Sequence, residues 1–132
     1  MIGLDTNVLV RYFTQDDRRQ SEIANHLIET QCSRSNPGRI SQIVLCELVW
    51  VLRRAYGYDK KPLLALLDQL LITAELDIEN GEIAWKALAA WRDGTADYSD
   101  YLVTLSNQAS GCERTYSFDR KLARHDTVTL AE

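Results

Sequence analysis

The chain has 132 residues, with 19 acidic side chains against 15 Lys and Arg, and a formal net charge of −4. This length suits one domain with its own core, and we expect residues 1–132 to form a single domain. Its 45% hydrophobic and 26% charged residues exclude a disordered or fibrous chain. The acidic balance argues against binding nucleic acid through bulk charge alone, but it leaves room for metal ions and a local basic patch.

Cysteine usage and hydropathy bear on the compartment. Cys32, Cys46 and Cys112 are widely spaced and form no CxxC pair, so neither a disulfide framework nor a zinc knuckle is expected. Asp5 interrupts the opening apolar stretch, and no apolar run approaches the roughly 20 residues of a membrane-spanning helix. We expect a cytoplasmic protein without a membrane partner.

Apolar periodicity and turn residues predict short strands that alternate with helices. In chain order, we expect a strand at 1–4, helices at 6–13 and 16–31, a strand at 39–41, helices at 42–56 and 59–72, a strand at 75–78, helices at 80–94 and 98–110, and strands at 114–118 and 127–130. Strands separated by helices are typical of a parallel sheet covered on both faces. The predicted fold class is α/β, a three-layer α/β/α sandwich with a central, mostly parallel sheet.

Two carboxylates directly follow predicted strands. Asp5 comes after the first apolar strand, and Asp119 comes after the strand that ends at Phe118. In an open parallel sheet the carboxyl ends of the strands border the ligand-binding crevice. The alternative is that each Asp only caps the helix that follows it.

Glu47 lies within a strongly amphipathic predicted helix. Its neighbours three and four residues away are all apolar: Ile43, Val44, Trp50 and Val51. We therefore expect Glu47 to face the core, where a carboxylate must be protonated, paired with a cation or bound to a metal. The alternatives are an edge position or a salt bridge to an arginine.

Asp97 and Asp100 begin the predicted helix at 98–110 and share one face of it. Asp97 also suits a helix cap. Asp100 lies on the same side as Val103 and Thr104, which is not an evident polar surface.

These carboxylates would repel one another if they converged, and a divalent cation would relieve that repulsion. Oxygen ligands without a His or Cys cluster favour Mg²⁺ or Mn²⁺ over Zn²⁺. Such an ion can lower the pKa of a bound water and stabilise charge on a phosphate, which suits phosphodiester hydrolysis. Convergence is an assumption here, because spacing along the chain does not establish it.

Other chemistries fit poorly. The sequence has no GxGxxG, GxxxxGK[ST] or GxSxG motif. His26 and His125 are expected to be solvated. Basic residues cluster locally, and they form either a solvated face or contacts to the phosphates of an RNA strand. These candidates are Arg11, Arg114, Arg120, Lys121 and Arg124.

Four segments together resemble the PIN domain and, within it, the VapC-type toxins of bacterial type II toxin–antitoxin pairs. They are MIGLDTNVLVRYF, LCELVWVLRR, ADYSDYLVTLSNQASGCE and TYSFDRKLAR. They cover nearly the whole chain in order. Each motif alone is weak, whereas the ordered set is quite specific.

The resemblance implies a Mg²⁺- or Mn²⁺-dependent endoribonuclease that cleaves RNA and is commonly dimeric. It also implies a cognate VapB-type antitoxin whose tail occupies the active-site groove. Carried over by position, the acidic set falls on Asp5, Glu47, Asp100 and Asp119, with Asp97 in support. The family's polar positions around these ligands fall on Thr6, Asn7 and Ser117, and Ser117 stands where the family usually has Thr.

Two rivals remain. One is a non-catalytic PIN-like module that acts through a protein partner. The other is a receiver domain, which places an acidic pair right after its first strand, whereas Asp5 stands alone before Thr6. Trp50, Trp85, Trp91 and the Leu-rich segment 63–71 form a large apolar face, which either completes the core or meets a second subunit.

Overall fold

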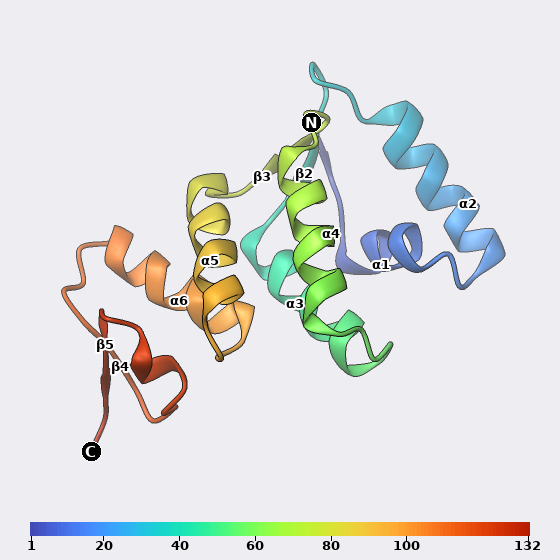
Figure 1. Cartoon of the computed structure of the whole chain (residues 1–132). Helices are drawn as coiled ribbons and strands as arrows, with labels where there is room; N and C mark the ends of the chain where they lie inside the picture. Colours follow the sequence, from blue (N-terminus) through green and yellow to red (C-terminus); the bar gives the residue numbers. More distant parts are fainter. The chain divides into compact units, whose positions relative to one another are not determined.

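The structure is a computed structural model that describes all of residues 1–132. The chain divides into two compact units, Met1–Gly81 and Glu82–Glu132, which are described in turn (Figure 1). The expectation of a single domain stays a prediction.

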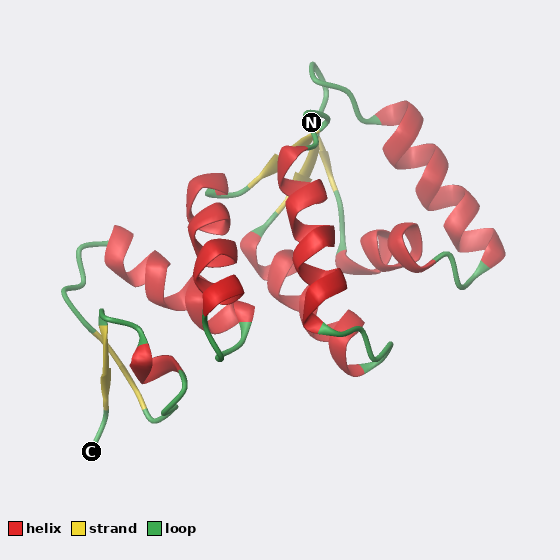
Figure 2. Ribbon diagram, viewed as in Figure 1, coloured by secondary structure: helices red, strands yellow, loops and turns green.

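The first unit contains a three-stranded parallel sheet in the order β1-β2-β3 (Figure 2). Its elements are β1 (Ile2–Gly3), α1 (Thr6–Thr14), α2 (Arg18–His26), the π-helical turn η1 (Leu27–Gln31), β2 (Gly38–Ile40), α3 (Gln42–Arg54), α4 (Lys60–Ile72) and β3 (Leu76–Ile78). In register, Gly38 lies opposite Ile2 on one side and Leu76 on the other. Helix α1 packs against α2 and α3, and α4 packs against α3 and β3.

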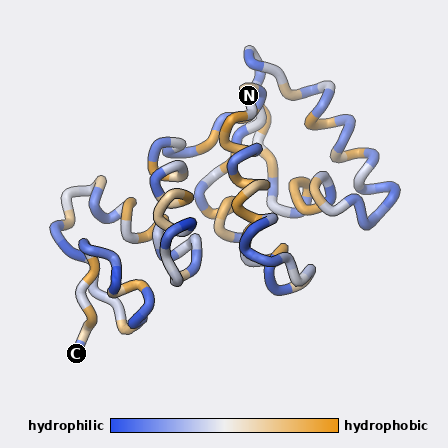
Figure 3. Tube along the Cα trace, in the orientation of Figure 1, coloured by the Kyte–Doolittle hydropathy of each residue, from blue (hydrophilic) through white to orange (hydrophobic).

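The core of this unit is built from the apolar faces of its helices. Leu45, Leu48, Leu63 and Leu67 of α3 and α4 are fully buried, and Figure 3 shows hydrophobic positions recurring along both helices. Gly38 is needed where it lies, since a Cβ there would come within 2.7 Å of the Leu4 side chain and 2.9 Å of Cys32 Sγ. The central strand therefore tolerates no side chain at this point.

The second unit contains most of α5 (Gly81–Asp93), then α6 (Tyr98–Ala109), β4 (Thr115–Ser117), the 3₁₀ turn η2 (Leu122–Arg124) and β5 (Val128–Leu130). Strands β4 and β5 pair in parallel. Helices α5 and α6 are joined through a buried aromatic pair, Trp91 and Tyr98, whose ring centroids lie 5.6 Å apart. The Tyr98 hydroxyl donates to the Ala84 carbonyl at 3.1 Å, which satisfies its buried polar group.

Both units combine α-helices with parallel strands, which confirms the predicted α/β class. Every strand and helix expected from the sequence is present. One predicted helix, 16–31, is shorter than expected because Asp17 caps α2 by accepting from the Gln20 N–H at 2.9 Å. Its last turn widens into η1, and the helical turn η2 follows Asp119, as the capping alternative for that residue implied. None of the helices is long and apolar enough to cross a membrane.

Candidate metal and RNA site

Asp5 lies at the carboxyl end of β1, where the chain turns into α1. Its Oδ1 accepts from the Thr6 N–H at 2.8 Å, so Asp5 is the N-cap of α1. The side chain is exposed. The helix cap and the metal ligand are compatible roles, because a carboxylate has a second oxygen that this bond does not use.

Glu47 of α3 lies next to Thr6, the residue that follows Asp5. The Thr6 hydroxyl donates to Glu47 Oε1 at 3.3 Å, joining α1 to α3 over a sequence separation of 41 residues. Thr6 itself is buried, at 8% exposed. This bond orients the carboxylate, which is the role expected of a hydroxyl beside a ligand.

The expectation that Glu47 faces the core is wrong. Glu47 is exposed, and so are Ile43 (71%) and Trp50 (59%) on either side of it. The buried face of α3 is centred on Leu45, Leu48 and Leu52, and Glu47 lies beyond its edge. The exposed Trp50 ring is covered in part by the Arg54 guanidinium, whose carbon lies 5.4 Å from the ring centroid.

Asp5, Thr6, Asn7 and Glu47 line one cleft of about 340 Å³, which we call the Asp5 cleft. Its other lining residues are Val10, Arg11, Val51 and Tyr56. Two predicted metal-ligating carboxylates, the two polar residues after Asp5 and one predicted RNA contact thus open onto the same space.

Arg11 is held in place by several bonds. Its Nη1 lies 3.0 Å from Asp16 Oδ1 and donates to the Tyr56 hydroxyl at 2.9 Å. Its Nε donates to Gln20 Oε1 at 2.7 Å. The Tyr56 hydroxyl in turn donates to Asp16 Oδ2 at 2.6 Å. The cation therefore lines the cleft in a defined orientation.

Asp16 and Tyr56 were not predicted from the sequence. Tyr56 lies 45 residues from Arg11, and nothing in the local spacing signals that the two meet. The hydrogen bonds from Tyr56 and then from Thr14, together with the charge of Arg11, lower the pKa of Asp16 to about 2. Asp16 is therefore ionised at neutral pH and serves as the counter-ion of Arg11.

The second unit carries the remaining carboxylates: Asp97, Asp100 and Asp119. Asp100 Oδ2 accepts from the Asp97 N–H at 3.1 Å, one half of a capping box at the start of α6. Partial burial raises the pKa of Asp100; the Asp97 hydrogen bond lowers it, while the charges of Asp97 and Asp119 raise it further. A cation near the Asp100 carboxylate would therefore offset the effects of burial and of the neighbouring negative charges.

Asp119 is fixed by the turn that follows it. Its Oδ1 accepts from the Lys121 N–H at 2.8 Å and the Leu122 N–H at 3.3 Å. Its own N–H donates to Ser117 Oγ at 3.0 Å, so Ser117 positions Asp119 through the backbone.

The predicted RNA contacts divide into two kinds. Arg114 donates to Thr129 Oγ1, the Asp126 carbonyl and the Val128 carbonyl at 2.7–3.0 Å, so its guanidinium braces β5. Arg120, Lys121 and Arg124 are exposed and form no ion pair. These three keep their donors available for a ligand.

The donor chemistry suits Mg²⁺ or Mn²⁺, since Asp and Glu oxygens are the ligands these ions prefer. Within neither unit, however, do three or more His, Cys, Asp or Glu side chains form a group that could hold a metal ion. Asp5 and Glu47 belong to the first unit, and Asp97, Asp100 and Asp119 belong to the second. The structure thus describes two groups of carboxylates, one in each unit. That the two groups hold one metal ion together stays a prediction.

Parallel strands that alternate with helices make this an α/β chain, and Asp5 and Asp119 lie just beyond the ends of β1 and β4. Comparison with family models finds the PIN domain over residues 2–128. The chain belongs to the PIN domain family, whose members are generally metal-dependent nucleases. Among curated proteins, none is found to be significantly similar to it.

Proposed function

We propose that this protein is a Mg²⁺- or Mn²⁺-dependent endoribonuclease and the toxin of a VapBC-like type II toxin–antitoxin pair. Asp5, Glu47, Asp100 and Asp119 would hold the ion, with Asp97 in support. Water would attack the phosphorus of an RNA phosphodiester and lose a proton, while the opposite P–O bond breaks and the leaving oxygen takes up a proton. Arg or Lys side chains would hold the backbone.

The observation that carries the proposal is the Asp5 cleft. Two carboxylates from α1's cap and from α3 open onto it, and Thr6 links the two elements by a hydrogen bond. A cleft that exposes carboxylates, neither of them in an ion pair, attracts a cation. Arg11 in the same lining, paired with Asp16, is the candidate phosphate contact there.

The metal would supply positive charge that offsets the carboxylates' repulsion and favours attack of water on the phosphate. The protein's own residues prepare for this in two ways. Backbone N–H groups hold one oxygen of Asp5 and one of Asp119, and Thr6 orients Glu47. Partial burial, together with the charges of Asp97 and Asp119, raises the pKa of Asp100, and a cation nearby would offset these effects.

The test is cleavage of RNA by purified protein with Mg²⁺ or Mn²⁺ and with EDTA. We expect EDTA to abolish cleavage, and Asp5→Asn and Asp100→Asn each to reduce it by about 100-fold or more. Glu113→Gln, which removes an exposed acid outside both acidic sets, is the matched control. Activity retained in either Asp variant, in protein free of contaminating nuclease, would refute the proposal.

The partners belong to the same proposal. A VapB-type antitoxin would silence the enzyme by occupying the groove, and adding it should stop cleavage. A homodimer is supported by Trp50 and Trp85, which stay 59% and 40% exposed, although Trp91 is buried. Light scattering of the purified chain measures its mass and so tests the dimer.

A non-catalytic PIN-like binding module is the second candidate. One observation favours it: neither unit alone brings three metal ligands together. This candidate predicts no EDTA-sensitive cleavage, and it predicts that Asp5→Asn leaves partner binding unchanged. The receiver domain is excluded by membership of the PIN family.

A further inference from the structure

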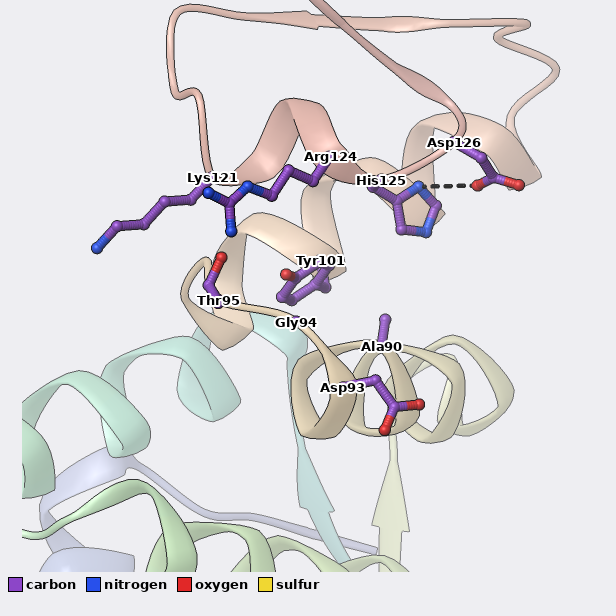
Figure 4. A pocket seen from close by; sticks show the side chains of 9 residues that line it. All are labelled: Ala90, Asp93, Gly94, Thr95, Tyr101, Lys121, Arg124, His125 and Asp126. Atoms are coloured by element: carbon purple, nitrogen blue, oxygen red, sulfur yellow. Dashed lines mark ion pairs between the residues drawn. The ribbon is translucent and has the colours of Figure 1, made fainter.

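The second unit contains a pocket of about 380 Å³ that includes none of the proposed metal ligands. We call it the Lys121 pocket. It is lined by Ala90, Asp93, Gly94, Thr95, Tyr101, Lys121, Arg124, His125 and Asp126 (Figure 4). This volume falls within the range of small-molecule sites, about 300–1,000 Å³.

The charges of the lining are separated. Lys121 and Arg124 lie on one side of the pocket with Thr95 below them, and neither forms an ion pair (Figure 4). On the other side, His125 Nδ1 lies 3.3 Å from Asp126 Oδ1, and Asp93 extends from the end of α5. An anionic group is therefore attracted to the Lys121 and Arg124 side and repelled from the opposite one.

The wall between these sides is aromatic and firmly placed. Tyr101 is 3% exposed, and its hydroxyl accepts from the Ala96 N–H at 3.2 Å. Gly94 makes this placement feasible, because a Cβ there would lie only 1.9 Å from the Tyr101 hydroxyl. The His125 ring lies 6.2 Å from the Tyr101 ring. Beside its cationic side the pocket therefore has a firmly placed lining, in which the half-buried His125 ring presents more aromatic surface than the buried Tyr101.

A ligand that matches this lining has a phosphate at one end and a flat or apolar body at the other. A ribonucleotide has this form. Lys121 follows Asp119 by two residues, and Tyr101 directly follows Asp100. Two lining residues are therefore close in sequence to proposed metal ligands.

We propose that the Lys121 pocket binds one nucleotide of the RNA substrate. Its phosphate would contact Lys121, Arg124 and Thr95, and its sugar and base would lie against the Tyr101 and His125 side. The role of this pocket in RNA cleavage rests on the proposed ribonuclease function. Nucleotide binding itself requires no catalysis.

The test is titration of the full chain with 5′-AMP, adenosine and inorganic phosphate in EDTA, followed by calorimetry and NMR. EDTA keeps divalent ions away from the carboxylates. We expect 5′-AMP to bind more tightly than either fragment, with shifts at Thr95, Tyr101 and His125. Lys121→Ala with Arg124→Ala should weaken 5′-AMP binding about tenfold or more.

Arg34→Ala is the matched control, since Arg34 is an exposed cation outside the pocket and outside the predicted RNA contacts. It should change 5′-AMP affinity by less than about twofold. Circular dichroism melting checks that the double variant folds, as expected for two exposed cations without partners. Equal affinity in the double variant and the wild type overturns the proposal. So does inorganic phosphate that binds as tightly as 5′-AMP, which would mark an anion site only.

The failure of this proposal is distinguishable from that of the nuclease assignment. If 5′-AMP binds as expected but no RNA is cleaved, the nuclease assignment fails and the pocket stands. If EDTA-sensitive cleavage is present but 5′-AMP binding ignores Lys121 and Arg124, the pocket is not a nucleotide site.

Discussion

At the scale of single residues, the acidic side chains serve the fold as well as the proposed site. Asp5 and Asp119 each use one oxygen to bind backbone N–H groups, and Asp100 does the same for the N–H of Asp97. Capping a helix and binding a metal ion are thus compatible roles for these residues. An oxygen held by the backbone fixes the direction in which the other oxygen points.

Thr6 offers the sharpest test of this arrangement. Thr6→Ala removes the hydroxyl that orients Glu47 and should weaken Mn²⁺ binding about 10- to 100-fold, as measured by isothermal titration calorimetry. Thr6→Ser keeps the hydroxyl and should bind Mn²⁺ within a few-fold of wild type. Equal affinity in all three proteins would show that the Thr6–Glu47 bond plays no part in metal binding.

Asp16 provides a prediction of pH dependence. Its folded-state pKa, about 2, lies below the ordinary value of 3.8, so its ionised form stabilises the fold. That stability is fully present above pH 3.8 and is lost as the pH falls through about 2. We expect Asp16→Asn to be less stable than wild type in urea unfolding at pH 5 to 7. The difference should shrink below pH 3.8; a constant difference down to pH 2 would contradict this account.

At the scale of elements, α3 shows how a helix divides between core and surface. Leu48 is fully buried, whereas the larger Trp50 is 59% exposed on the face that carries Glu47. Leu48→Ala should lower the free energy of unfolding by about 2–5 kcal/mol, through lost burial and a cavity. Trp50→Ala should cost less than about 1 kcal/mol, the value of its exposed contact with Arg54. Denaturant melts measure both, and a reversed order would place Trp50 in a core.

Helix α1 links the elements of the first unit. Its N-cap is Asp5, its first residue bonds Glu47 of α3, and Arg11 in its last turn joins Asp16 and Tyr56. One helix therefore positions a proposed metal ligand, the hydroxyl that bonds Glu47 and a proposed phosphate contact. The elements themselves follow from local periodicity and caps, but this convergence depends on how α1 packs against α3.

At the scale of the whole molecule, the central question is whether carboxylates of both units share one ion. We expect saturating Mn²⁺ to raise the stability of wild type by about 2.7 kcal/mol at 100 times its dissociation constant. Asp5→Asn, in the first unit, and Asp119→Asn, in the second, should each remove most of this gain. Thermal melts with and without Mn²⁺ measure it. If only one variant loses the gain, the ion belongs to one unit.

Local sequence patterns predicted the helices and strands, but not the contacts between distant segments. Periodicity and turn residues predicted every strand and α-helix, because these signals act between residues a few positions apart. The same local reasoning predicted a buried Glu47 and was wrong, because its apolar neighbours Ile43 and Trp50 lie outside the packed face. Neither sequence segment indicates that Arg11 and Tyr56 form a hydrogen bond.

The sequence by itself determined the α/β class, the order of elements and the PIN resemblance, because apolar spacing and short motifs act locally along the chain. Only the tertiary structure decided which face of α3 is buried, that Thr6 bonds Glu47, and that Asp16 and Tyr56 hold Arg11. These depend on contacts between distant segments, whose free energy comes from packing that no local pattern specifies.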